Sequence, residues 1–180
     1  MTDQKLSPNI ISFIALANEY CQMLENAESA TRKELLAEVL KILPRIYIIA
    51  GDLVECQYYP EHEIGAYLTE PVYDQVRDVL CRILGEEDCY LEVFVEEMKY
   101  SDVPIACNIS ENLADLYQVF YNYVASVKDV PTEVQIELTG ICKSDFHLYW
   151  GQTLCNVLRA VHTAYYTPYN DEPHMKYNIE

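Results

Sequence analysis

The chain has 180 residues, of which 51% are hydrophobic and 23% are charged, a balance typical of one globular domain and not of a disordered chain. Its 12 Lys and Arg residues against 29 Asp and Glu residues give a net charge of −17, which disfavours nucleic acids and anionic membrane surfaces as partners because phosphate groups repel a polyanion. The longest strongly apolar run, 46–50, is far shorter than a membrane span.

Two amphipathic helices are expected first. Ser7-Pro8 is a typical helix start, and apolar residues then recur with helical period as far as Leu24. The pair Thr31 and Glu34 predicts a capping box for the second helix. Pro44 lies inside the second apolar pattern, so we expect a kink there, because proline removes one backbone hydrogen bond.

The rest of the chain contains further helices and two less regular stretches. Helices are expected over 69–84, 110–127, 132–142 and 144–166. Residues 51–68 have no clear period and are predicted to form a loop, whereas 86–108 fit either a short helix or an extended segment. We expect 167–180 to form a polar C-terminal arm.

These helices predict an all-α fold. At least five apolar stripes must be buried, and the simplest arrangement is one helical bundle spanning 1–180, with five to seven helices and a kink near Pro44. Seven cysteines, an odd number with no Cys-x-x-Cys pair, favour a reduced, cytoplasmic protein, although the count alone does not exclude a disulfide.

Several reaction classes lack their motifs. No two of the five glycines are closer than eleven residues, so neither common glycine-rich nucleotide-binding motif is present. The chain also lacks Gly-x-Ser-x-Gly, His-Glu-x-x-His and Glu-x-x-His, the last being the usual source of di-metal sites in helical bundles. We therefore predict no cofactor and favour a non-catalytic protein, while an enzyme stays open.

Two small groups of residues have weak functional interpretations. Glu61-His62-Glu63 can bind a metal ion if a distant third ligand exists, but a solvated acidic loop is the simpler interpretation. Cys155 and His162 lie two turns apart on one predicted helix, about 10 Å along its axis, which is too far for direct proton transfer. Sixteen tyrosines suit either a pocket or interface, or the edge of the core. Those on the last predicted helices are Tyr117, Tyr121, Tyr149, Tyr165 and Tyr166.

Two polar rows provide the best candidate site. One contains Glu111, Asp115, Gln118 and Asn122, and the other contains Gln152, Asn156 and Arg159 on the last predicted helix, which also holds the single Trp150. The rows are solvated faces, or they face each other through an Arg159–Asp115 pair, or they line a cleft for a polar ligand. The candidate polar cluster is Asp115, Gln118, Trp150, Gln152, Asn156, Arg159 and His162.

The same helices resemble a known family. The segments 109–118, Tyr149-Trp-Gly-Gln152 and Leu158-Arg-Ala-Val-His162, together with Leu43-Pro44, Val72-Tyr73 and 87–90, resemble domain-of-unknown-function family 5063 from Bacteroides and related bacteria. The resemblance covers nearly the whole chain. It implies a small, soluble bacterial protein, and it supplies no activity and no functional residue.

Three functions therefore remain open. We favour a non-catalytic binding or adaptor module that contacts a basic or neutral protein partner through an acidic, Tyr-rich surface. The alternative is an enzyme or sensor that binds a small polar ligand between the two polar rows. The third is a polyanion mimic that occupies a nucleic-acid-binding protein. Self-association as a homodimer also stays open.

Overall fold

The predicted helix starts are present in the structure. The computed structural model describes residues 5–92 and 104–168. Ser7 Oγ accepts a hydrogen bond from a backbone N–H of the first turn of α1 (Pro8–Glu25), and the capping box of Thr31 and Glu34 begins α2 (Arg32–Gly51). Helix α2 continues through Pro44, and the kink there stays a prediction.

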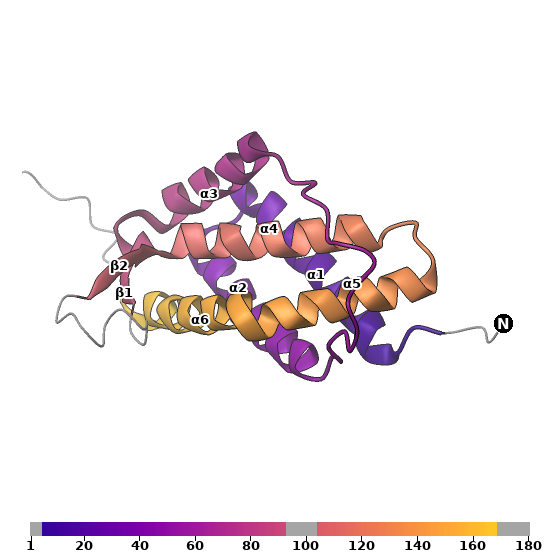
Figure 1. Cartoon of the computed structure of the whole chain (residues 1–180). Helices are drawn as coiled ribbons and strands as arrows, with labels where there is room; N and C mark the ends of the chain where they lie inside the picture. Colours follow the sequence, from indigo (N-terminus) through magenta and orange to yellow (C-terminus); the bar gives the residue numbers. More distant parts are fainter. Residues whose placement is uncertain (1–4, 93–103, 169–180) are drawn as a thin grey trace, which may run out of the picture.

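Helix α4 is central to the bundle. The elements that follow α2 are α3 (Glu70–Leu84), the 3-10 turn η2 (Gly85–Asp88), β1 (Cys89–Glu92), β2 (Ile105–Asn108), α4 (Ile109–Val127), α5 (Thr132–Asp145), the π-turn η4 (Phe146–Trp150) and α6 (Gly151–Tyr166). Helix α4 packs against α1, α3, α5 and α6, while α2 packs against α1 and α6. Figure 1 shows α4 lying between α3 and α6. The predicted all-α, single-domain bundle is confirmed.

A two-stranded hairpin lies at the start of α4. Strands β1 and β2 are antiparallel, and Cys89 pairs with Asn108. The carboxylate of Asp88 is 3% exposed and accepts hydrogen bonds from Ser110 N–H, Ser110 Oγ and Asn108 Nδ2 at 2.7, 2.7 and 3.0 Å. This carboxylate caps the N-terminus of α4, where a negative charge is favoured. Of the ambiguous stretch 86–108, the described ends form a turn and strands, and 93–103 lie outside the described residues.

The sequence suggested two separate helices over 132–142 and 144–166, but α5 and α6 are continuous. They are joined through the π-turn without leaving helical backbone conformation, and Figure 1 shows them as one long rod. A Cβ atom on Gly151 would lie 2.5 Å from the backbone oxygen of Phe146, so the π-turn needs glycine at this position. The predicted arm, 167–180, lies mostly outside the described residues.

The core contains a group of aromatic side chains. Trp150 is fully buried, and its ring lies 6.2 Å from Phe13 and 5.2 Å from Phe120, centroid to centroid. The Trp150 indole N–H donates to the backbone oxygen of Cys142 at 3.1 Å. The π-turn therefore directs the single tryptophan into the core, with its one polar atom satisfied.

Candidate functional site

The α6 polar row holds the hairpin. Arg159 Nη2 donates to the backbone oxygen of Leu91 at 2.9 Å, and Asn156 Nδ2 donates to Glu92 Oε1. Glu92 Oε2 accepts a hydrogen bond from the Cys107 thiol at 3.0 Å. Two members of the predicted cluster, Asn156 and Arg159, therefore bind strand β1 of the same chain.

The α4 polar row contacts different elements. Asp115 Oδ1 accepts a hydrogen bond from the Tyr73 hydroxyl of α3 at 2.8 Å, and burial together with this carboxylate raises the pKa of Tyr73 well above its usual range. The predicted Arg159–Asp115 pair is wrong, because each residue is bonded to a different element. No hydrogen bond or ion pair between described residues joins the two rows.

The remaining members of the predicted cluster do not converge on one site. Trp150 belongs to the core, where its ring packs against Phe13 and Phe120. Gln118 and Gln152 are exposed, and the His162 ring packs on Tyr166 at 4.7 Å, one helical turn further on. The cluster was inferred from helical spacing. Such spacing shows which residues lie on the same face of a helix, but it does not show which element packs against that face.

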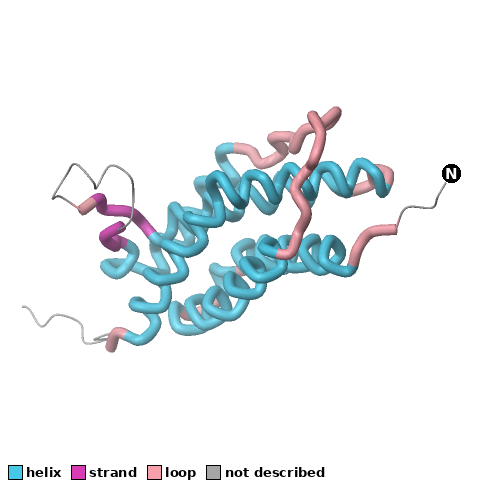
Figure 2. Tube along the Cα trace, turned by 60° about the horizontal axis from the view of Figure 1, so that its bottom comes forward, coloured by secondary structure: helices cyan, strands magenta, loops and turns pink. Residues whose placement is uncertain are grey.

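The connection from α2 to α3, residues 52–69, provides a better candidate. We call it the pinned loop. It crosses α4 and α5 without secondary structure of its own, and Figure 2 shows it as the pink segment passing over these helices. It is longer than about 15 residues, and irregular connections of that length are uncommon in compact domains unless they are functional.

Glu137 of α5 holds the middle of the pinned loop. Its side chain is 7% exposed, and its carboxylate accepts hydrogen bonds from the backbone N–H groups of Glu61 and His62. The His62 ring Nδ1 also lies 2.9 Å from Glu137 Oε2. The hydrogen bonds from the His62 side chain and from the two backbone groups lower the pKa of Glu137. The carboxylate thus accepts hydrogen bonds from two backbone donors of a segment that has no secondary structure to pair them.

Two polar residues of α4 hold the end of the pinned loop. Asn122 Oδ1 accepts hydrogen bonds from the backbone N–H groups of Tyr67 and Leu68, both at 2.8 Å. Ser126 Oγ accepts from Gly65 N–H at 2.9 Å. Asn122 was one of the predicted row, and its partner is the loop backbone. Two members of the row on α4, Asp115 and Asn122, are therefore structural anchors for α3 and the loop.

Close packing holds the beginning of the pinned loop. A Cβ atom on Gly140 would lie 2.8 Å from the backbone nitrogen of Cys56, so the loop backbone rests directly on α5. Lys143 Nζ donates to the backbone oxygens of Ala50 and Gly51 at 2.9 and 3.1 Å, where α2 ends. The pinned loop is thus held near its beginning, in its middle and at its end.

The pinned loop presents tyrosine side chains to solvent. Tyr58, Tyr59 and Tyr67 are 62%, 94% and 56% exposed. The sequence pointed instead to tyrosines of the last helices. Of those, Tyr117 is buried and donates to Glu25 Oε1 at 3.0 Å, while Tyr149 and Tyr166 are exposed.

A groove of about 600 Å³ lies between the pinned loop and the corner where α4 meets α5. We call it the loop groove. Its loop side contains Tyr59, Glu61, Glu63 and Tyr67, and its helical side, which includes the turn between α4 and α5, contains Val130, Val134 and Leu138. Aromatic, apolar and acidic groups therefore lie together here, a combination that suits contact with another molecule.

Comparison with known proteins supports the resemblance seen in the sequence. The family described as "Domain of unknown function (DUF5063)" matches residues 4–167. The chain belongs to this family. The crystal structure of protein BF1032 from Bacteroides fragilis, a target of the Northeast Structural Genomics Consortium, is similar to this family member, with 35% sequence identity and a TM-score of 0.76. The match covers 91% of this chain and 96% of that chain. No curated protein matches.

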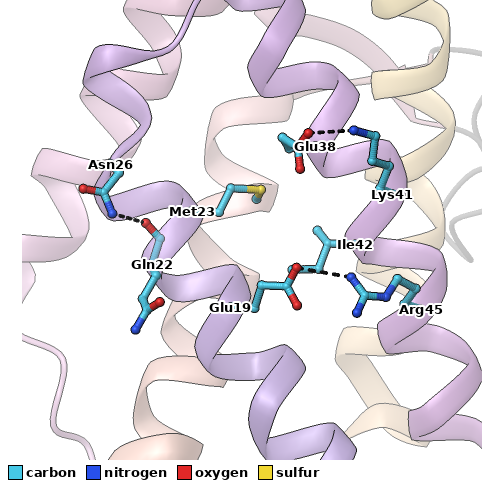
Figure 3. Close-up of a pocket in the computed structure, with 8 residues that line it drawn as sticks. All are labelled: Glu19, Gln22, Met23, Asn26, Glu38, Lys41, Ile42 and Arg45. Atoms are coloured by element: carbon cyan, nitrogen blue, oxygen red, sulfur yellow. Dashed lines mark hydrogen bonds and ion pairs between the residues drawn. The ribbon is translucent and has the colours of Figure 1, made fainter.

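A second groove in this family member lies between α1 and α2. Its volume is about 360 Å³, and Figure 3 shows charged side chains on both helices around Met23 and Ile42. Arg45 Nη1 lies 3.2 Å from Glu19 Oε1, and Lys41 Nζ lies 2.7 Å from Glu38 Oε1. These charges are already paired with each other, as is common between neighbouring exposed helices.

Neither metal chemistry nor thiol chemistry is supported at the candidate positions. Within 5–92 and 104–168, no three His, Cys, Asp or Glu side chains are arranged to hold a metal ion. Burial raises the pKa of the Cys21 and Cys107 thiols to about 12, and it also raises the pKa of Cys155. Thiols with such pKa values stay protonated near neutral pH and are poor nucleophiles.

Among the described helices, none has the length and apolar character needed to span a bilayer.

Proposed function

We propose that the protein is a non-catalytic binding module that contacts a protein partner of basic or neutral character through the pinned loop. The observation that carries the proposal is the exposure of three tyrosines on a loop whose backbone is hydrogen-bonded to two helices. Tyrosine contributes a large contact area and loses little conformational entropy when it binds, and it is enriched where proteins bind each other.

Charge supports a basic or neutral partner over an acidic one. The chain carries a net charge of −17, and Glu61 and Glu63 lie beside the exposed tyrosines. An acidic partner would be repelled over a long range, which slows association and weakens binding. A reduced, cytoplasmic setting fits the seven free cysteines and is part of this proposal.

The experiment compares exposed tyrosines at two places. A partner is first identified by affinity purification from the source cells, and its binding is then measured with both proteins purified. We expect Tyr59→Ser with Tyr67→Ser to weaken binding about tenfold or more, because aromatic residues at the centre of an interface carry much of its energy. The control is Tyr166→Ser, which removes an exposed tyrosine from the end of α6.

Two results would reject the proposal. Equal loss of affinity in Tyr166→Ser would place the contact elsewhere, and unchanged affinity in the loop variant would do the same. The polyanion-mimic hypothesis makes a different prediction, since binding would then fall steeply with salt and depend little on the tyrosines. Analytical ultracentrifugation of the purified chain tests self-association.

A further inference from the structure

We propose that the loop groove binds the side chain of an arginine residue presented by the protein partner. This inference rests on the proposed function, and it adds the chemical group that the surface recognises.

The helical side of the loop groove suits a hydrocarbon stem. Val130, Val134 and Leu138 line this side, and Leu138 reaches into the core. An ion without a stem would leave this apolar wall in contact with water. Long basic side chains bury their methylene groups along apolar surface while the charged end stays polar. A basic side chain therefore matches both parts of the groove.

The charge of the loop groove is negative. Glu61 and Glu63 line it, and the remaining titratable side chains of its lining are Tyr59, Tyr67 and His62. The His62 ring is already in contact with the Glu137 carboxylate, which adds a further negative group beneath the loop. In the adjacent turn, Lys128 and Asp129 cancel each other in formal charge. The groove consequently disfavours anions.

The carboxylates of the loop groove differ from those of the α1–α2 groove. Glu19 and Glu38 are paired with Arg45 and Lys41, so an incoming cation would have to displace an existing ion pair. Glu61 and Glu63 form no ion pair through their side chains with any described residue. An incoming cation at the loop groove meets carboxylates that are still available for pairing.

Arginine fits this lining better than lysine. Its planar guanidinium carries five donors that can bond two carboxylates, and it also packs on tyrosine rings. The lysine ammonium is a compact, strongly hydrated charge, and it gains less from an aromatic surface. Arginine is also the basic residue that is enriched at protein interfaces.

The test uses the full chain and two small probes. N-acetyl-arginine amide is titrated while methyl NMR signals of valine and leucine are recorded, and N-acetyl-citrulline amide serves as the neutral probe of the same shape. We expect shifts at the methyl groups of Val130, Val134 and Leu138 with the arginine probe. The exposed Val72 on α3 provides a reference methyl away from the groove.

A variant pair separates a specific site from general attraction. Glu61→Gln with Glu63→Gln removes two charges from the groove, and Glu86→Gln with Glu111→Gln removes two exposed charges from the opposite end of α4 and its neighbouring turn. We expect the first variant to bind the arginine probe about two- to fivefold more weakly, and the second to bind it like the wild type.

Three outcomes would overturn the inference: equal shifts with citrulline, shifts spread over all acidic faces, or equal weakening in both variants. Failure of the proposed function is distinguishable from these. In one outcome, a purified partner loses affinity with Tyr59→Ser and Tyr67→Ser but not with Glu61→Gln and Glu63→Gln. That result would support the pinned loop as the contact surface and reject the recognition of an arginine side chain. A partner insensitive to both changes would reject the proposed function itself.

Discussion

Replacement of Asn122 by Ala should release the end of the pinned loop. The Asn122 side-chain oxygen accepts both backbone hydrogen bonds from Tyr67 and Leu68, at 2.8 Å each. Alanine removes this acceptor without adding bulk. Both N–H groups then depend on water, and Leu68 is half-buried, where water is a poor replacement.

The expected loss of stability is about 1–2 kcal/mol. A typical hydrogen bond contributes about 0.5–1.5 kcal/mol net, so two bonds give about 1–3 kcal/mol. The lower part of this range applies because Tyr67 is exposed and its N–H group can be hydrated in the variant. Asn122→Asp is the matched control, since it keeps an oxygen acceptor at the same position.

Urea denaturation measures the global effect, and amide hydrogen exchange measures the local one. We expect the amides of Tyr67 and Leu68 to exchange faster in Asn122→Ala and to remain protected in Asn122→Asp. If Asn122→Ala leaves both amides protected, the side chain does not hold the loop, and the reasoning from this contact is refuted.

Three further predictions concern the other attachments of the fold. Gly140→Ala should destabilise the protein by about 1–3 kcal/mol in urea denaturation because its Cβ would lie 2.8 Å from loop backbone, whereas Gly51→Ala, with nothing within 4 Å, should cause no such loss. Asp88→Ala should lower the free energy of unfolding by about 2–4 kcal/mol and lower the melting temperature, because it leaves the N–H and hydroxyl groups of Ser110 without an acceptor. In the folded state the pKa of Glu137 lies below its usual value of 4.5. Its contribution to the free energy of unfolding is therefore present above that pH, and it is lost as the pH falls through the folded pKa. The melting temperature of the wild type should therefore fall more steeply below about pH 4.5 than that of Glu137→Gln, and parallel curves would show that the His62 contact is not responsible.

The helices were predictable because their signals are local. A capping box depends on two residues three apart, so Thr31 and Glu34 identified the start of α2 correctly. Helical period likewise identified α1, α3 and α4 from their buried apolar residues. The number of helices within the described residues lies in the predicted range of five to seven.

The join between α5 and α6 was not predictable from the same signals. No local signal indicated that the helix over 132–142 continues into the expected helix 144–166, which already included Gly151. Its actual role depends on the approach of the Phe146 backbone oxygen, which appears only when the π-turn is formed. Trp150 of the predicted polar cluster packs among Phe13 and Phe120 in the core, and contacts with such distant residues likewise leave no local signal.

The candidate surface was only partly predictable because its anchors are distant in sequence. The polar row on α4 was detected, but Asn122 bonds loop backbone groups more than 50 positions away and Asp115 bonds Tyr73 of α3, and hydrogen bonds of that kind leave no periodic pattern. Glu137 could have been noticed as a charge on the apolar side of α5, among residues that include Leu138. A buried charge in a helix is rare without a partner, and that is a usable signal.

The hydrogen bonds that hold the backbone of the pinned loop help to decide whether the loop moves or stays in place. A catalytic lid must open, and lids are drawn from weakly held segments. The pinned loop has the opposite character, since Glu137, Asn122 and Ser126 bond its backbone and leave its tyrosine side chains outside. Ordering a flexible residue costs about 1–2 kcal/mol of backbone entropy, and a loop that is ordered before contact avoids this loss when it binds. The attachment of the backbone and the exposure of the side chains therefore favour a preformed contact surface over a moving gate.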